Sequence, residues 1–228
     1  FLVSAQDAAN ETATSFRGLA DEDDDTITIA GRSRSDFEVR NPGDLLWLAR
    51  VENGLDLGEW AMQIGASALI GPNGTGEDAS TTIAGIDGKL KWTAAGGTRG
   101  YPFLTIEGEA LWRNFEAEED TVNTLPATDL EDRGAFLSIL YGFRPGWAIG
   151  IRGEVASGEG DDPTTDSQRD DRLRIAPVLT WSPSHFSRLR LEYDYDSFDH
   201  LTADGEDHAH SVWLGLEVLI GSHPAHGF

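Results

Sequence analysis

Charged and apolar side chains alternate along much of this chain, and the charged ones have the types and spacing that suit chemistry. In residues 187–198, SRLRLEYDYDSF, Leu189 and Leu191 point to one side of an extended strand while Arg190 and Glu192 point to the other. Arg, Glu and Asp at successive positions opposite Leu and Tyr are typical of a transmembrane barrel strand, with lipid outside and a wet lumen inside. The next arm repeats the pattern, with Val212, Leu214, Leu216, Val218 and Ile220 opposite Ser211, Trp213, Gly215, Glu217 and Leu219.

The charges on the polar face form a set that would line such a lumen. Arginines on neighbouring strands would face carboxylates across the pore, and the resulting transverse field would select solutes by charge and size. In the alternative, these residues fill and knit a small closed barrel by ion pairing, because ten strands leave little open bore. The predicted pore-lining residues are Arg152, Glu154, Arg172, Arg174, Arg188, Arg190, Glu192, Asp194 and Glu217.

Histidines and carboxylates gather in the last long connection of the chain. Imidazole nitrogens and carboxylate oxygens suit zinc, calcium or another divalent ion. Two histidines spaced two residues apart on an extended strand would point the same way. The alternative is that a polar loop collects such residues by chance. No resident cofactor is otherwise expected, and the predicted metal-binding residues are His200, Asp207, His208 and His210.

The same histidines raise the alternative of a hydrolytic site at a barrel rim. Asp199-His200 or Asp207-His208 would supply an acid and a base. Adjacent residues on a strand point in opposite directions, so each pair would need a loop conformation or a partner from another strand. No GxSxG nucleophile motif is present. We therefore expect that the protein is not an enzyme.

Composition limits the classes of partner and architecture. The 228 residues carry 40 acidic and 17 basic side chains, a net charge of -23, which argues against nucleic-acid binding because phosphate contacts need a basic face. The absence of cysteine excludes disulfides and thiolate metal sites. No apolar run approaches the roughly 18 residues of a spanning helix, so a membrane crossing would require a barrel.

The connections between predicted strands alternate strictly between short and long. Short periplasmic turns and long extracellular loops are the arrangement of bacterial outer-membrane barrels. We expect one domain, 1–228, with ten antiparallel strands, a long acidic extracellular loop over 6–44 and a second over 116–132. Tight turns are expected near 56, 96, 145 and 184, and longer loops near 25, 75, 123, 163 and 203. An aromatic girdle at the short-turn end would comprise Trp60, Trp92, Phe143, Trp147, Trp181 and Phe186.

Several stretches resemble more than a generic barrel. They are LARVENGLDLGE at 48–59, TIEGEALWRNFE at 105–116, FRPGWAIGIRGE at 143–154 and the two arms of the last hairpin. From Leu45 onward the chain resembles the C-terminal part of porin-like outer-membrane proteins often labelled zinc-regulated or TonB-dependent receptors. More strands precede this region in that family, so we expect a portion of a larger barrel. No plug domain or energy-coupling box is recognisable, which does not favour active uptake.

The resemblance implies a location and a set of partners. The location is the outer membrane of a Gram-negative bacterium, where membrane lipids and lipopolysaccharide surround the barrel. The terminal Phe228 resembles the aromatic signal that barrel-assembly machinery reads. The expected function is passive passage of small solutes or cations, with zinc as a candidate. The alternatives are a closed structural barrel whose acidic loops bind an external partner, and a soluble sandwich that would fold without detergent.

Overall fold

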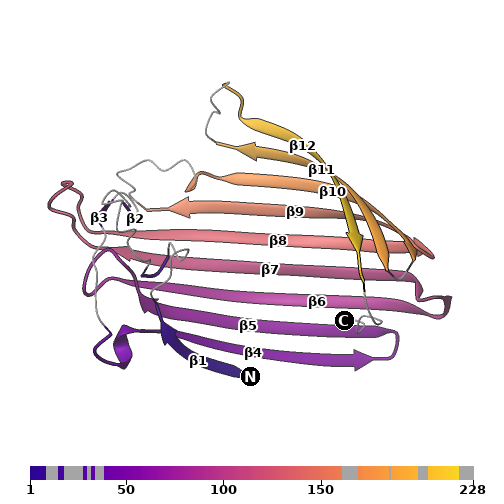
Figure 1. The fold of residues 1–228 in the computed structure, drawn as a ribbon, viewed down its shortest axis with the longest axis horizontal. Coiled ribbons are helices and arrows are strands. Elements are labelled where there is room, and N and C mark those ends of the chain that lie inside the picture. Colours follow the sequence, from indigo (N-terminus) through magenta and orange to yellow (C-terminus); the bar gives the residue numbers. More distant parts are fainter. Residues whose placement is uncertain are drawn as a thin grey trace.

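The chain folds into one large antiparallel sheet. The structure, a computed structural model, describes residues 1–8, 15–17, 28–29, 32–33, 39–160, 169–184, 186–199 and 205–220. Within them, ten strands follow one another in the order β1-β4-β5-β6-β7-β8-β9-β10-β11-β12 (Figure 1), and β2 pairs with β3 in a small separate sheet. The prediction of an all-β fold with ten antiparallel strands is confirmed.

The strands match the predicted segments closely and several are longer. No helix of the described residues is long and apolar enough to cross a membrane. The elements are β1 Leu2–Asp7, β2 Thr28–Ile29, β3 Arg32–Ser33, the 3-10 helix η1 Pro42–Asp44, β4 Leu45–Leu57, β5 Trp60–Pro72, β6 Ser80–Thr98, β7 Tyr101–Ala117, β8 Thr128–Arg144, β9 Trp147–Glu159, β10 Arg172–Ser184, β11 Ser187–Phe198 and β12 His208–Val218.

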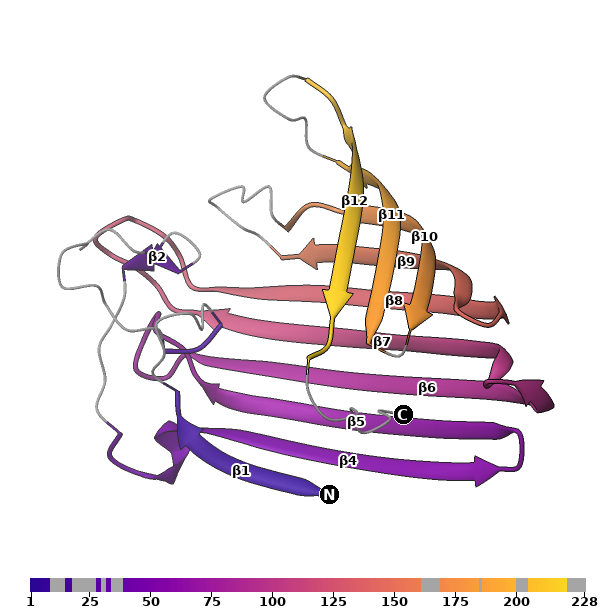
Figure 2. The ribbon, with the colours of Figure 1, turned by 45° about the vertical axis from the view of Figure 1, so that its right-hand side comes forward.

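The large sheet twists and curls along its width. Strands β10, β11 and β12 swing across the flatter part formed by β4–β8 (Figure 2). Such coiling follows from the right-handed twist of each strand, accumulated over many strands. Among the described residues, β1 pairs only with β4 and β12 only with β11, so the sheet is an open trough rather than a closed barrel.

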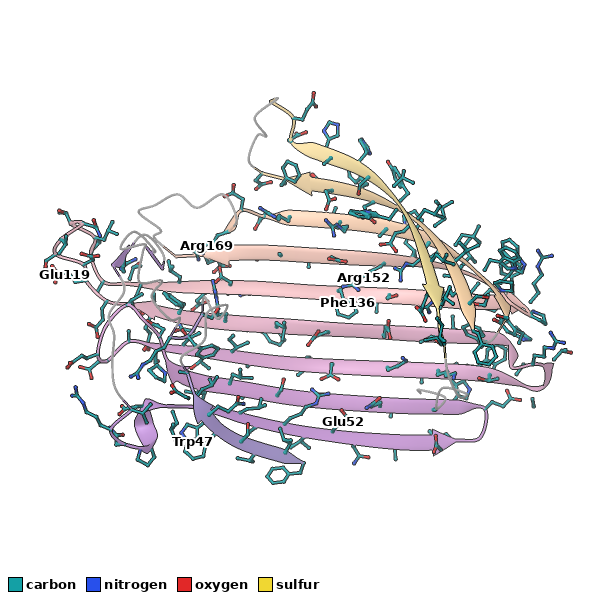
Figure 3. The ribbon with its side chains drawn as sticks, in the orientation of Figure 1. Trp47, Glu52, Glu119, Phe136, Arg152 and Arg169 are labelled. Atoms are coloured by element: carbon teal, nitrogen blue, oxygen red, sulfur yellow. The ribbon has the colours of Figure 1, made fainter. Side chains whose placement is uncertain are left out.

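Strand register divides the side chains into an apolar face and a charged face. Ile106, Ile139 and Ile151 lie opposite one another on β7, β8 and β9 and belong to the apolar face. One residue along, Glu107 and Ser138 are partners on the charged face. The charged face lies inside the curl, where Figure 3 shows the side chains of Phe136 and Arg152. A register slip of one residue would exchange the two faces, so the hydrophobic pattern sets the pairing.

The apolar face is a band of limited height with distinct borders. Residues 84–92 of β6 cover it from the short turns upward, a length of about 27 Å at ~3.4 Å per residue. Paired tryptophans form the lower border, with ring centroids 6.3 Å apart in the tilted pair Trp60–Trp92 and 5.8 Å apart in the stacked pair Trp147–Trp181. Arg133, which pairs with Glu159 at 3.2 Å, lies on the same face beyond the upper border. The height agrees with the roughly 25 Å apolar band of outer-membrane barrels.

The sheet is a single layer, and little covers its apolar face. Leu137 and Val155 in the middle of the band are each 54% exposed. The accessible surface is 14672 Å², whereas a compact soluble protein of 24.8 kDa has about 10,000 Å². A soluble sandwich buries the equivalent face against a second sheet. This sheet has no second layer among the described residues. An apolar solvent such as lipid, or another protein surface, is therefore needed to cover the band.

Two predicted connections differ from the structure. The tight turn expected near 96 lies at Arg99 and Gly100, whose φ values are 55° and 76°. Positive φ at both central residues is the type I′ pattern that suits the twist of a hairpin, so β6 runs on to Thr98. The acidic loop predicted over 116–132 is shorter than expected, because β7 ends at Ala117 and β8 begins at Thr128.

Candidate functional site

The predicted pore-lining residues all fall on the charged face. Glu154, Arg174 and Asp196 are successive cross-strand partners on β9, β10 and β11. Arg188 lies opposite Glu217 on β12. By the same register, the face also carries Arg152, Arg172, Arg190, Glu192 and Asp194. That these residues line a pore remains a prediction.

Most of these charges pair with near neighbours. Arg174 Nε donates to Asp196 Oδ1 at 2.6 Å across one strand boundary. Arg188 Nη2 similarly reaches Glu217 Oε2 at 2.5 Å. Arg152 pairs with Glu154 on its own strand at 2.6 Å. Local pairing of this kind agrees with the alternative in which these residues hold a small closed barrel together by ion pairs. A transverse electric field across a pore remains a prediction.

One ion pair reaches over an entire strand. Arg50 on β4 donates to both carboxylate oxygens of Asp87 on β6, at 2.7 and 2.8 Å, and its Nη2 also reaches Glu52 at 2.9 Å. The intervening β5 offers Gly65 at this point. A Cβ on Gly65 would lie 2.5 Å from Arg50 Nη2 and from Asp87 Oδ2. A larger residue at position 65 would therefore displace the bidentate contact.

Replacing Gly65 by valine should separate Arg50 from Asp87. We expect unfolding at a lower urea concentration than in the wild type, because Arg50 and Asp87 lose their two shared hydrogen bonds. Equilibrium unfolding in urea measures the loss. Gly153→Val is the control, since a Cβ on Gly153 meets nothing within 4 Å. Equal stability of the two variants would contradict this account of Gly65.

An aromatic ring divides the charged face near its centre. The guanidinium of Arg152 lies 4.0 Å from the ring centroid of Phe136, and both side chains are labelled in Figure 3. Stacking on an aromatic face holds the arginine flat while its edge binds Glu154. Hollows of about 330 and 290 Å³ flank this pair, and Phe136 lines both. Phe136 was not among the residues predicted from the sequence, although an aromatic residue at a polar position of a period-2 pattern was a visible signal.

Glu109 is an uncompensated acid between the two hollows. It lies opposite Asp87 on β6 and Phe136 on β8, and it lines both hollows. Asp87 is bound by Arg50, and the neighbouring Glu107 lies 3.4 Å from Lys89. Among the described residues, Glu109 has no ion-pair or hydrogen-bond partner. Its carboxylate therefore contributes a net negative charge to the middle of the charged face.

The histidines of the predicted metal site lie on the opposite face. His210 is the cross-strand partner of Tyr195, and His208 that of Ser197, which places both on the apolar face near its upper border. Their rings are 5.3 Å apart, so they do point the same way. Their positions have the same parity as Val212 and Leu214, so they point away from the face that carries the predicted pore-lining residues. His200 lies outside the described residues.

Among the described residues, His208 contacts two carboxylates that precede it in the chain. Its Nδ1 donates to Asp207 Oδ1 at 2.8 Å, and this hydrogen bond holds the pKa of Asp207 below its ordinary value. Its Nε2 lies 3.8 Å from Glu206. The described part of the chain contains no group of three or more His, Asp or Glu residues arranged to hold a metal. No hydrogen bond joins Ser197 to His208 in the described part of the chain. The zinc or calcium site and the rim hydrolase both remain predictions.

A hydrogen-bonded cap organises the long-loop end of the sheet. Asn73 is fully buried, and its Nδ2 donates to the carbonyl oxygens of Ser80 at 2.9 Å and Glu116 at 2.8 Å. Its Oδ1 accepts from the backbone N–H of Thr75 at 3.0 Å and from the Thr75 hydroxyl at 2.7 Å. The asparagine thereby ties the β5–β6 loop to β7. For this β5–β6 connection, only a turn-rich loop was predicted from the sequence.

Parts of the connection predicted as an acidic extracellular loop over 6–44 are buried in this cap. The side chain of Phe16 is 6% exposed, and Arg113 on the charged face donates to the Ser15 hydroxyl at 2.8 Å. Arg113 also binds Asp132, which accepts from Arg169 Nε at 2.9 Å. These described parts therefore lie against the charged face. Residues 18–27, which include the acidic run, lie outside the described residues.

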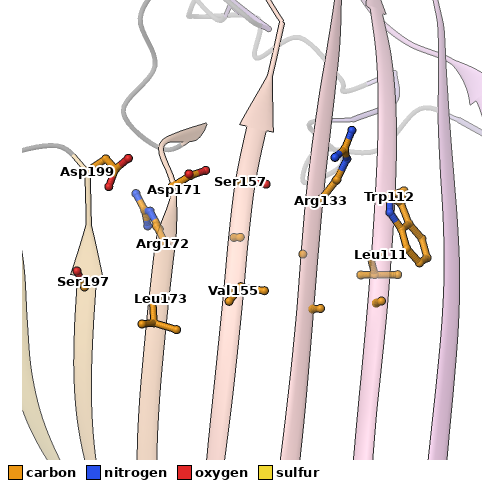
Figure 4. A pocket seen from close by; sticks show the side chains of 14 residues that line it. Leu111, Trp112, Arg133, Val155, Ser157, Asp171, Arg172, Leu173, Ser197 and Asp199 are labelled. Atoms are coloured by element: carbon orange, nitrogen blue, oxygen red, sulfur yellow. The ribbon is translucent and has the colours of Figure 1, made fainter.

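A shallow hollow of about 340 Å³ lies near the upper end of β7–β11 (Figure 4). Its lining includes Val155 and Leu173 of the apolar face and Leu111 and Arg172 of the charged face. The small residues Gly134, Ala135 and Ala156 also line the hollow, which is open to solvent. The hollow is therefore a depression in the wall and not an enclosed substrate cavity.

Comparison with known proteins adds no relative to this geometry. No protein-family model, no curated protein and no solved structure matches the chain. The resemblance to porin-like receptors thus rests on the sequence motifs alone.

Proposed function

We propose that this chain forms the wall of a porin-like β-barrel channel in the outer membrane of a Gram-negative bacterium. The observation that carries the proposal is the two-faced, single-layer sheet. Its apolar band has the height and aromatic border of a lipid-facing surface, and its other face is charged along the length of the strands. Water would have to solvate that face, so the arrangement suits a wet lumen through which small hydrophilic solutes pass.

Closure of the lumen requires partners for the two edge strands. β1 and β12 each leave one row of backbone groups without strand partners among the described residues. In lipid, such groups must be satisfied by further strands. We propose that strands beyond those described here complete the barrel, as the family resemblance suggests. Lipids and lipopolysaccharide would then cover the apolar band, and barrel-assembly machinery would insert it.

The balance of charge favours cations among the permeating solutes. Local pairs neutralise many of the charges on the described wall, whereas Glu109 stays uncompensated. An unpaired carboxylate at a constriction attracts cations and repels anions over a distance of about 8 Å at physiological salt. Zinc would be one such cation, without any need for a binding site of its own.

A planar-bilayer recording tests the channel. The full protein, reconstituted and held under a salt gradient, should give steady single-channel currents with a cation-selective reversal potential. Repeating the recording with zinc chloride in place of potassium chloride tests zinc permeation. Folded protein in a silent bilayer would favour the alternative, a closed barrel whose loops bind an external partner.

The variant Glu109→Gln should lower cation selectivity. Removing the uncompensated carboxylate is expected to reduce the cation-to-anion permeability ratio about twofold or more, since each charge in a narrow pore acts at short range. The reversal potential measures the ratio. Glu119→Gln is the matched control, with the same chemical change at the tip of the β7–β8 loop (Figure 3). If the reversal potential shifted equally in both variants, selectivity would depend on the total charge of the protein and not on the position of Glu109.

A further inference from the structure

Trp213 is the exception among the seven tryptophans of this chain. The other six lie on the apolar face, where a lipid-facing surface uses such rings as anchors. Trp213 lies on the charged face, as the cross-strand partner of Glu192, and is 62% exposed. No requirement of the lipid-facing band accounts for a large ring at this position. The six on the apolar face are Trp47, Trp60, Trp92, Trp112, Trp147 and Trp181.

Hydrogen bonds anchor the edge of the indole and leave its ring available. Trp213 Nε1 donates to Ser211 Oγ at 3.0 Å, and Ser211 Oγ donates to Asp194 Oδ2 at 3.3 Å. Asp194 is only 4% exposed, so this chain of two hydrogen bonds ends on a buried carboxylate. A side chain fixed by a supporting group of this kind presents a preorganised surface to a ligand.

The position beside the ring carries no side chain. The next residue on the same face of β12 is Gly215, and a Cβ built there meets nothing closer than Arg190 Cβ at 3.8 Å. Arg190 is the cross-strand partner of Gly215, and its Nε donates to Glu192 at 2.7 Å. The result is a shelf with the indole along one side and backbone as its floor.

The charged groups around the shelf cancel one another. Arg190 pairs with Glu192 and Arg188 with Glu217, so the rim carries two cations and two anions. Half of each arginine side chain is exposed, which leaves N–H groups free to donate. An organic cation would meet the two arginines and an anion would meet the two carboxylates. A neutral ligand with many hydroxyl groups would be repelled by neither and can bind both.

We propose that Trp213 and the Arg188–Glu217 and Arg190–Glu192 pairs form a binding subsite for a neutral sugar. The apolar C–H face of a pyranose ring stacks on the indole, whose amphipathic character suits a ligand that is apolar on one face and polar at its edge. The hydroxyl groups at the ring edge bond to the arginines and carboxylates. The subsite names a solute class for the proposed channel and rests on that function only for its access from the lumen.

Sugar binding in detergent micelles tests the subsite without any need for conductance. The full protein is titrated with maltotriose, cellotriose and tri-N-acetylchitotriose, and saturation-transfer NMR measures Kd for each. At least one trisaccharide should bind the wild type at millimolar concentration. Trp213→Ala should weaken that binding about tenfold, the scale of a lost aromatic contact. Trp213→Phe should recover part of it, and Trp112→Ala on the apolar face should bind as the wild type does.

Each outcome decides the subsite separately from the channel. Failure of all three trisaccharides to bind would overturn the subsite, as would equal binding by Trp213→Ala and the wild type. Tighter binding of choline chloride than of any sugar would replace the neutral ligand by an organic cation. Glu192→Gln gives a second variant with the indole intact, and should weaken the sugar if its hydroxyls bind the rim. Absence of single-channel current together with retained sugar binding would contradict the proposed channel and support the subsite.

Discussion

The variant Ile139→Arg is expected to lose about 2–4 kcal/mol of folding free energy in a phospholipid bilayer. Ile139 lies in the middle of the apolar band, between Ile106 and Ile151 on the adjacent strands. An arginine there would place a charge in hydrocarbon, with no described acid beside it on that face. Folding into phosphatidylcholine vesicles over a urea series, followed by tryptophan fluorescence, measures the change.

The neighbouring variant Leu140→Arg is the matched control. Leu140 belongs to the same strand and points to the charged face, between Thr105 and Gly150. An arginine there would face water, so a loss below about 1 kcal/mol is expected. Equal losses at both positions would mean that the band is not lipid-facing. A negligible loss at Ile139 would mean that it faces water, as an exposed surface of a soluble protein does.

The variant Asn73→Ala should cost about 2–4 kcal/mol in the stability of the long-loop end. The buried amide of Asn73 serves as donor and acceptor at once, so its removal leaves the carbonyl of Glu116 and the N–H of Thr75 without these partners. Unsatisfied buried polar groups cost about 1–3 kcal/mol each before any relaxation. Hydrogen exchange should report fast exchange at the Thr75 amide, with β9–β11 unchanged.

Asn123→Ala provides the comparison for this experiment. Asn123 is an exposed asparagine at the tip of the β7–β8 loop, where its amide bonds to Asp120. Water can replace that contact, so a change within about 0.5 kcal/mol is expected. If Asn73→Ala left the Thr75 amide protected, the cap would be held by the backbone turn and not by the buried side chain.

The channel and the sugar subsite make different demands on the same wall. Glu109 lies on β7, near the middle of the strand order, whereas Trp213 lies on the edge strand β12, and both belong to the charged face. Charge selectivity depends on Glu109, whereas a neutral sugar is insensitive to it. The double variant Glu109→Gln with Trp213→Ala should therefore show the same loss of cation selectivity as Glu109→Gln alone and the same weakening of sugar binding as Trp213→Ala alone.

The strand positions and the face of each residue were determined by the sequence alone. A period of two is a local property, so the alternation in 187–198 specified which side chains share a face before any neighbour was known. Short turns and the tryptophan border followed from the same local signals. The predicted pore-lining set fell on one face because every member obeyed the period.

Contacts between distant segments were decided only by the tertiary structure. Arg50 meets Asp87 because register aligns Gly65 between them, and no local pattern contains that alignment. His208 and His210 were assigned to the last long connection, whereas β12 begins at His208 and its pairing with β11 puts both histidines on the apolar face. The cap around Asn73 depends on a carbonyl of β7 that is remote in the sequence. Local periodicity sets the direction of a side chain, but its partner depends on strand order and register, which only the folded sheet provides.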